Sequence, residues 1–163
     1  GSEMCIRDRS TGLAIDGIAP KVSKIHTAIY KAQKCTMIRH LTQPDIVAVS
    51  CLGKTMYPMI DDFAQIAGIS IRNCGWVDGE TDECAKAIAK ALDGRNAVLV
   101  DKMGALVTGN SEGDMEALSL VMEKGAATDI GANIFNRVHY VPTAECMIMR
   151  TVYVAKYSKQ ISK

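Results

Sequence analysis

Residues 97–108 read AVLVDKMGALVT, and this segment gives the strongest indication of the fold. Its first four residues form an uninterrupted apolar run, which is typical of a central β-strand covered on both faces. Gly94-Arg95-Asn96 turns the chain into that strand, and residues 105–108 are expected to continue the sheet beyond Lys102-Met103-Gly104. Because a strand buried on both faces needs helices on each side, the segment predicts an α/β fold.

Helical and strand patterns before and after this segment supply the layers. Residues 21–32 carry apolar side chains at the spacing of a helix with one buried face. Thr81 is placed to cap a helix whose apolar residues form one stripe, and Thr143 is placed to cap the last helix. The helices are predicted over residues 21–32, 45–51, 59–67, 82–92, 111–135 and 144–157, and the flanking strands over 35–42 and 69–73. No internal repeat interrupts the pattern, which therefore indicates one domain.

Composition and charge exclude several classes of protein. With 48% apolar residues, 23% charged residues and a net charge of +1, the 163-residue chain is expected to form a compact soluble domain. Lys and Arg are spread along the sequence, so we expect neither a nucleic-acid partner nor an anionic membrane partner. No apolar run reaches the ~20 residues that a bilayer span needs. Six cysteines without C-x-x-C spacing indicate reduced thiols and hence a cytoplasmic location.

The first ten residues are expected to lie outside the natural protein. Gly1-Ser2 resembles a protease-cleavage scar, and residues 4–9 resemble a translated adapter from library preparation. We therefore interpret residues 1–10 as an expression or adapter-derived tail. Residues 11–163 are interpreted as one domain that lacks its natural N-terminus.

Four phrases of the chain occur in an order that is known from one protein family. They are Ile25-His26-Thr27-Ala28-Ile29-Tyr30, Val47-Ala48-Val49-Ser50, Gln65-Ile66-Ala67-Gly68 and Val98-Leu99-Val100-Asp101-Lys102-Met103-Gly104. In this order and spacing, most of residues 20–135 resembles the class II aldolase/adducin family. Its members include fuculose-phosphate and rhamnulose-phosphate aldolases, a ribulose-phosphate epimerase and the non-enzymatic head of adducin. The resemblance implies a layered α/β/α domain with a central, mostly antiparallel sheet flanked by helices.

The resemblance also implies a metal site that this chain has largely lost. Enzymes of the family hold zinc through an H-x-H pair and a third histidine before a glycine, and use a glutamate as acid and base. These positions fall on His40 and Thr42, on Lys102 or Met103, and near Val22. Structural and catalytic zinc sites use at least three protein donors, and one imidazole does not suffice. We therefore expect a degenerate site with no metal and no cofactor, although zinc is the cofactor of the family.

Lys102 and Asp101 are the candidate catalytic residues if the chain retains an activity. A lysine whose pKa is lowered by burial can attack a carbonyl and form a Schiff base. The alternative is a lysine that is solvated or paired with Asp101. For His40, the alternative to a lone metal ligand is a strand histidine oriented by one hydrogen bond.

Other candidates favour structural roles. Asp61 and Asp62 are adjacent, and neighbours on a helix point about 100° apart, so shared proton chemistry is disfavoured. His26 and Tyr30 are spaced for packing on one helix face. The triplet Gly53-Lys54-Thr55 ends like a P-loop, but Ala48 stands where that motif needs another glycine.

Two functional hypotheses remain. The first is a class II aldolase-like pseudoenzyme that serves as an assembly or binding partner, either as a homo-oligomer or with a paralogous domain. The second is an aldehyde-lyase or epimerase of carbohydrate metabolism that acts on a small carbonyl ligand such as a sugar phosphate. In the second case the site is metal-free or is completed by a neighbouring subunit, because enzymes of the family form cyclic tetramers.

Overall fold

The computed structural model describes residues 4–5, 20–76, 78 and 81–156. The strands are β1 (Met4–Cys5), β2 (Met37–Leu41), β3 (Arg72–Asn73), β4 (Ala97–Val100) and β5 (Gly104–Gly109). The helices are α1 (Pro20–Ala32), α2 (Pro44–Ser50), α3 (Asp61–Ile66), α4 (Asp82–Leu92), α5 (Glu112–Ile134) and α6 (Thr143–Lys156). None of the helices in the described ranges is long and apolar enough to cross a membrane.

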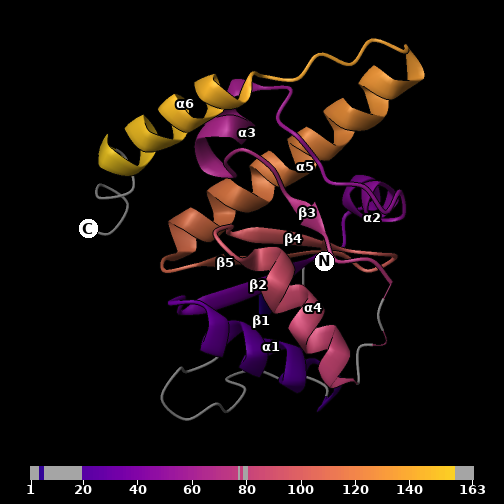
Figure 1. Cartoon of the computed structure of the whole chain (residues 1–163), viewed down its shortest axis with the longest axis vertical. Helices are drawn as coiled ribbons and strands as arrows, with labels where there is room; N and C mark the ends of the chain where they lie inside the picture. The colour runs from indigo at the N-terminus through magenta and orange to yellow at the C-terminus, as the bar shows by residue number, and fades with distance from the viewer. Residues whose placement is uncertain (1–3, 6–19, 77, 79–80, 157–163) are drawn as a thin grey trace.

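The strands form one sheet in the order β1-β2-β5-β4-β3 (Figure 1). Three of its pairings, β1 with β2, β2 with β5 and β4 with β5, are antiparallel, and only β3 with β4 is parallel. The predicted α/β architecture with a mostly antiparallel sheet is confirmed. The segment 97–108 supplies β4 and most of β5, which lie inside the sheet rather than at its edges.

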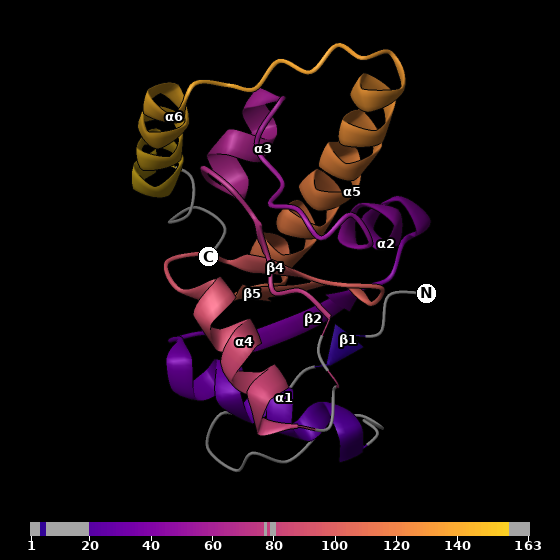
Figure 2. The same ribbon diagram turned by 45° about the vertical axis from the view of Figure 1, so that its right-hand side comes forward.

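Helices cover both faces of the sheet (Figures 1 and 2). Helices α1 and α4 lie on one face, α2, α3 and α5 lie on the other, and α6 packs outside α3. Each face of the sheet has its own hydrophobic core under its helices. Strand β4 contributes to both cores, because successive side chains of a strand point to opposite faces. Ala97 and Leu99 join the core under α2, α3 and α5, whereas Val98 and Val100 join the core under α1 and α4. All four are buried, as the apolar run predicted.

Side-chain hydroxyls cap two helix starts, one of them at the predicted Thr81. The Thr81 hydroxyl accepts a hydrogen bond from the Cys84 amide at 3.2 Å and caps α4. The Ser111 hydroxyl accepts one from the Asp114 amide at 3.1 Å and caps α5. Thr143 differs, because it is the first residue of α6 rather than its cap. The Pro142 carbonyl accepts the first helical bond instead, from the Cys146 amide at 3.0 Å.

The strand expected over residues 69–73 is shorter in the structure. Only Arg72 and Asn73 pair with β4. Ile71 instead exchanges two backbone hydrogen bonds with Met56, both 2.9 Å long, in an isolated bridge. Ile71 therefore pairs with the loop after α2 and not with β4.

Part of the predicted tail lies in the described structure. Residues 4–5 form β1 and pair with Ile38 and Arg39, whereas residues 1–3 and 6–10 lie outside the described residues. Strand pairing uses backbone groups, so it does not identify where the tail came from. The expression or adapter origin of residues 1–10 stays a prediction.

Candidate functional site

The site implied by the sequence lies where the β4–β5 hairpin passes the end of β2. Lys102 adopts a left-handed φ of 63° in the hairpin, and Gly104 follows with a φ of 95°. A Cβ at Gly104 would collide with the backbone oxygen of Leu41. The glycine therefore allows the hairpin to approach β2 closely, and this approach brings residue 103 beside His40.

His40 forms a hydrogen bond with the backbone of this hairpin. Its Nε2 lies 2.7 Å from the carbonyl oxygen of Met103. A carbonyl oxygen only accepts hydrogen bonds, so Nε2 carries the proton and donates it. A metal ligand needs a free lone pair on nitrogen, and in this arrangement His40 has one only on Nδ1. The structure thus brings together His40 and Met103, two of the positions that the sequence nominated.

Lys102 lies over an aromatic ring rather than against its neighbour Asp101. Its Nζ is 4.6 Å from the centre of the Trp76 ring, and both side chains are exposed. A cation over an aromatic face is stabilised in its charged form. No salt bridge joins Lys102 and Asp101 in the described part of the chain. Trp76 was missed by the sequence analysis, although it is the only tryptophan and follows a glycine.

Asp101 is partly exposed, but one oxygen of its carboxylate is buried without a hydrogen bond within the described structure. Its Oδ1 is buried and has no hydrogen-bond partner among the described residues. Its backbone amide donates to the Gly75 carbonyl at 3.4 Å, which fixes the hairpin against the loop after β3. Cys74 lies in the same loop, and burial, with Cys84 and Asp101 adding to it, raises the pKa of the Cys74 thiol to about 11. Cys74 is therefore protonated at neutral pH and offers no thiolate.

The residues at these positions do not fit a zinc ion. His40 donates from Nε2 to a carbonyl and offers one lone pair, on Nδ1. Thr42 offers an exposed hydroxyl, and Met103 offers a thioether. Lys102 adds a positive charge instead of a lone pair. Over the described ranges, no group of three His, Cys, Asp or Glu residues could hold a metal. Val22, where the resemblance places the glutamate, has a side chain outside the described structure.

The other sequence candidates are scattered away from this site. Asp61 and Asp62 begin α3, both are exposed, and Asp62 pairs with Lys124 at 2.7 Å. His26 is fully buried in α1, in line with packing, and the Tyr30 hydroxyl donates to the Thr36 carbonyl at 3.3 Å. These side chains contribute to the fold and do not converge on one point.

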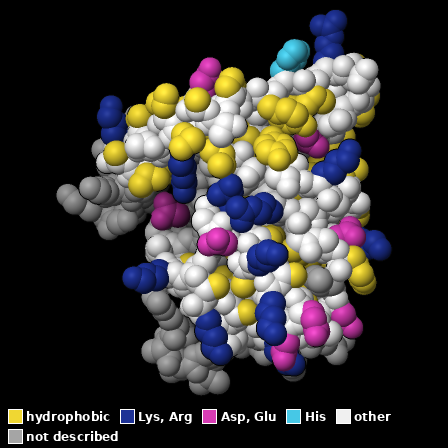
Figure 3. Space-filling model, viewed as in Figure 1, with side chains coloured by type: hydrophobic (Ala, Val, Ile, Leu, Met, Phe, Trp, Pro, Cys, Tyr) yellow, Lys and Arg dark blue, Asp and Glu magenta, His cyan; other side chains and the backbone are white. Residues whose placement is uncertain are grey.

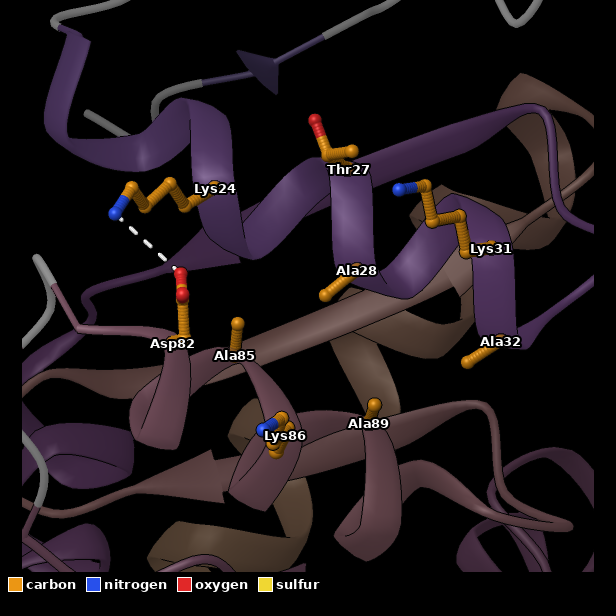
Figure 4. A pocket seen from close by; sticks show the side chains of 9 residues that line it. All are labelled: Lys24, Thr27, Ala28, Lys31, Ala32, Asp82, Ala85, Lys86 and Ala89. Atoms are coloured by element: carbon orange, nitrogen blue, oxygen red, sulfur yellow. Dashed lines mark ion pairs between the residues drawn. The ribbon is translucent and has the colours of Figure 1, made fainter.

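A groove of about 510 Å³ runs between α1 and α4 on the other side of the sheet from α5 (Figure 4). Ala28 and Ala32 of α1 and Ala85 and Ala89 of α4 line it, and three lysines lie along it. Lys24 forms an ion pair with Asp82 across one end at 3.4 Å, and both side chains are largely exposed. Such a pair contributes at most about 1 kcal/mol. Apart from these charges, the Thr27 hydroxyl is the one polar side-chain group in the described lining of the groove.

Comparison with known protein families agrees with the observed fold. The Class II Aldolase and Adducin N-terminal domain matches residues 2–130. The chain belongs to this family. No curated protein sequence matches it significantly.

Solved structures of this family share the fold. An L-fuculose 1-phosphate aldolase superposes with a TM-score of 0.78 and 22% identity, over 86% of this chain and 68% of that chain. YgbL from Klebsiella pneumoniae, described as a putative aldolase/epimerase/decarboxylase, gives a TM-score of 0.71 and 24% identity, over 84% and 69%. The L-fuculose-1-phosphate aldolase from Thermus thermophilus gives 0.62 and 20%, over 78% and 70%. At these identities the likeness establishes the fold.

Proposed function

We propose that this class II aldolase-like domain has lost the zinc centre and acts in assembly or binding rather than in catalysis. The observation that carries the proposal is the donor set at this site, where His40 is the one imidazole and Thr42, Lys102 and Met103 stand at the other positions. The His40 Nε2 also lies 2.7 Å from the Met103 carbonyl oxygen. The one remaining imidazole is protonated on the nitrogen that faces the former third ligand position. Thr42 and Met103 cannot replace two imidazoles, because zinc in proteins is bound by Cys, His, Asp or Glu.

Metal analysis of the purified protein tests this proposal directly. After incubation with zinc and removal of free ion, we expect well under one zinc per chain, with no difference between the wild type and His40→Ala. No aldol cleavage of fuculose 1-phosphate is expected from either protein. One zinc per chain that is lost in His40→Ala would overturn the proposal.

A matched variant shows whether the remaining geometry is intact. Thr42→His with Met103→His restores three imidazoles at the positions where the resemblance places them. If the fold keeps the spacing of the site, the double variant gains stoichiometric zinc that the wild type lacks. Zinc bound equally by both proteins would contradict a degenerate site.

The assembly role is supported by an apolar surface on one side of the molecule. Hydrophobic side chains gather over α6 and over the C-terminal end of α5 (Figure 3). The large exposed ones in this region are Ile134, Phe135, Tyr140, Met147, Ile148, Val152 and Val154. Contiguous exposed apolar surface of this kind marks interaction sites on soluble proteins. We therefore propose that α6 faces a second copy of the chain or a paralogous domain.

A second candidate function is supported by the unsatisfied Asp101 carboxylate beside Lys102. In this version the Lys102 amine attacks the carbonyl carbon of a small compound, and the carbonyl oxygen leaves as water when the Schiff base forms. Asp101 takes the proton from the attacking nitrogen and returns it to the departing oxygen. Lys102 is exposed, so this role requires a ligand or a neighbouring subunit to exclude water. Borohydride trapping with a hydroxyketone tests it: an adduct in the wild type that is absent in Lys102→Met supports the lyase, and no adduct in either removes it.

A further inference from the structure

A second hollow lies at the end of β4 opposite Lys102, away from the His40 site. It has a volume of about 500 Å³ and lies between the C-terminal end of α3, the turn before β4, and α6. Its polar and glycine lining comes from Gly68, Gly94, Arg95, Asn96, Arg150 and Thr151. Among the described residues, both charged residues of the lining are arginines, and no Asp or Glu belongs to it. The lining therefore favours a negatively charged occupant.

Both guanidinium groups are held in place by the protein. Arg95 donates from Nε and Nη2 to the Ser70 hydroxyl at 3.3 Å and from Nη1 to the Gly94 carbonyl at 3.0 Å. Arg150 donates from Nη1 to the carbonyls of Gln65 and Ile66, at 3.0 and 2.6 Å. Arginine has five N–H donors, so each side chain keeps donors that have no partner in the described structure. Fixed side chains lose little entropy when they bind a ligand.

The charge around Arg95 is not fully balanced. Burial lowers the pKa of Arg95, and the neighbouring Arg72 lowers it further, while Asp93 offsets part of this effect. Arg72 is itself bound to the C-terminal end of α4 through the carbonyls of Lys90, Ala91 and Asp93. An anion between Arg95 and Arg150 would relieve this repulsion.

A neighbouring hollow on the other side of Arg150 provides an internal comparison. It has a volume of about 240 Å³, shares Asn96 and Arg150 with the first, and adds the carboxyl of Asp114. In the smaller hollow Arg150 therefore lies with the Asp114 carboxylate. In the larger hollow the other charged residue of the described lining is Arg95, which is also a cation. An anion is expected between Arg95 and Arg150 and not beside Asp114.

We propose that the hollow between Arg95 and Arg150 binds a phosphate group. A phosphate monoester carries about −1.5 to −2 charges and three acceptor oxygens, which match two guanidinium groups better than one carboxylate does. The Thr151 hydroxyl donates to the Met147 carbonyl at 2.8 Å and can accept from a protonated phosphate oxygen. The site is independent of zinc, of Lys102 and of the proposed loss of activity.

Titration calorimetry with inorganic phosphate tests the site, with chloride used to match the ionic strength. We expect saturable binding to the wild type and an affinity at least tenfold weaker in Arg95→Gln. Arg137→Gln removes one positive charge outside this lining and should stay within twofold of the wild type. A second titration with glycerol phosphate distinguishes the source: tighter binding than inorganic phosphate indicates a phosphorylated small molecule, and equal binding indicates the free ion.

Arg95→Lys keeps the proposal testable if Arg95→Gln does not fold. The lysine retains the positive charge but lacks the planar guanidinium group, so we expect a phosphate affinity between those of the wild type and Arg95→Gln. Circular dichroism of each variant verifies the fold. No saturable binding of either phosphate compound to the wild type would overturn the proposal, and so would binding that Arg95→Gln and Arg95→Lys leave unchanged.

Discussion

At the scale of single residues, Gly104 determines how closely the β4–β5 hairpin approaches β2. Its φ of 95° is a conformation that L side chains rarely adopt, and a Cβ there would collide with the backbone of Leu41. We expect Gly104→Ala to lower the free energy of unfolding by about 2–4 kcal/mol, because a backbone atom cannot move aside as a side chain can. Urea titration measures the change.

Gly131 is the matched control for this substitution. It lies inside α5, and a Cβ added there meets nothing within 4 Å. Gly131→Ala should raise the free energy of unfolding by about 0.5–1 kcal/mol, because alanine favours the helix. If both variants were equally stable, the close approach of the hairpin to β2 would not be the reason for glycine at position 104.

The family resemblance, and not residue types alone, nominated part of the candidate site. The resemblance placed His40 and Met103 at related ligand positions, and the structure brings them together. The contact itself was not predictable, because it uses the Met103 carbonyl, whose direction depends on the left-handed φ of Lys102. The Trp76 contact was not predictable either, since residues 76 and 102 are brought together by the β3–β4 pairing and by the hydrogen bond from the Asp101 amide to the Gly75 carbonyl.

At the scale of elements, side-chain caps fix where α4 and α5 begin. The Ser111 hydroxyl accepts from the Asp114 amide and donates to the Asp114 carboxylate at 2.8 Å. Ser111→Ala should therefore lower the free energy of unfolding by about 1 kcal/mol. Thr128→Ala is the control, because its hydroxyl bonds to the Lys124 carbonyl inside the same helix and caps nothing. Thermal unfolding of the two variants should show a loss for Ser111→Ala only.

Elements with a strong local signal were predicted well, and those that depend on distant partners were not. The apolar stripe and the Thr81 cap predicted α4 with its start at Asp82. The strand over residues 69–73 was predicted too long because Ile71 bonds to Met56, a partner that no local pattern reveals. The start of α6 was placed one residue too late, because the Pro142 carbonyl already accepts a helical bond from the Cys146 amide, which puts Thr143 inside the helix.

At the scale of the whole molecule, two sites of different chemistry lie at opposite ends of β4. The hairpin end of β4 holds His40, Asp101 and Lys102 around a site that does not fit zinc, whereas the opposite end holds Arg95 and Arg150 around the proposed phosphate site. The length of β4, four residues at about 3.3 Å each, keeps the two sites about 13 Å apart. Changes at one site should therefore leave the other unaffected, since sites more than about 10 Å apart without shared partners act additively.

The exposed face of α6 gives the last prediction at this scale. Ile148 is 66% exposed and Met147 58% exposed on the helix that packs outside α3. If α6 forms the contact between copies, Ile148→Glu buries an unpaired charge in it and favours the separate chain. Light scattering after size exclusion should show an oligomer for the wild type and about 17.6 kDa for Ile148→Glu. Leu52→Glu, a change at a similarly exposed residue just after α2, should keep the mass of the wild type. A wild-type protein of 17.6 kDa would exclude self-association through α6 and leave a paralogous domain as its partner.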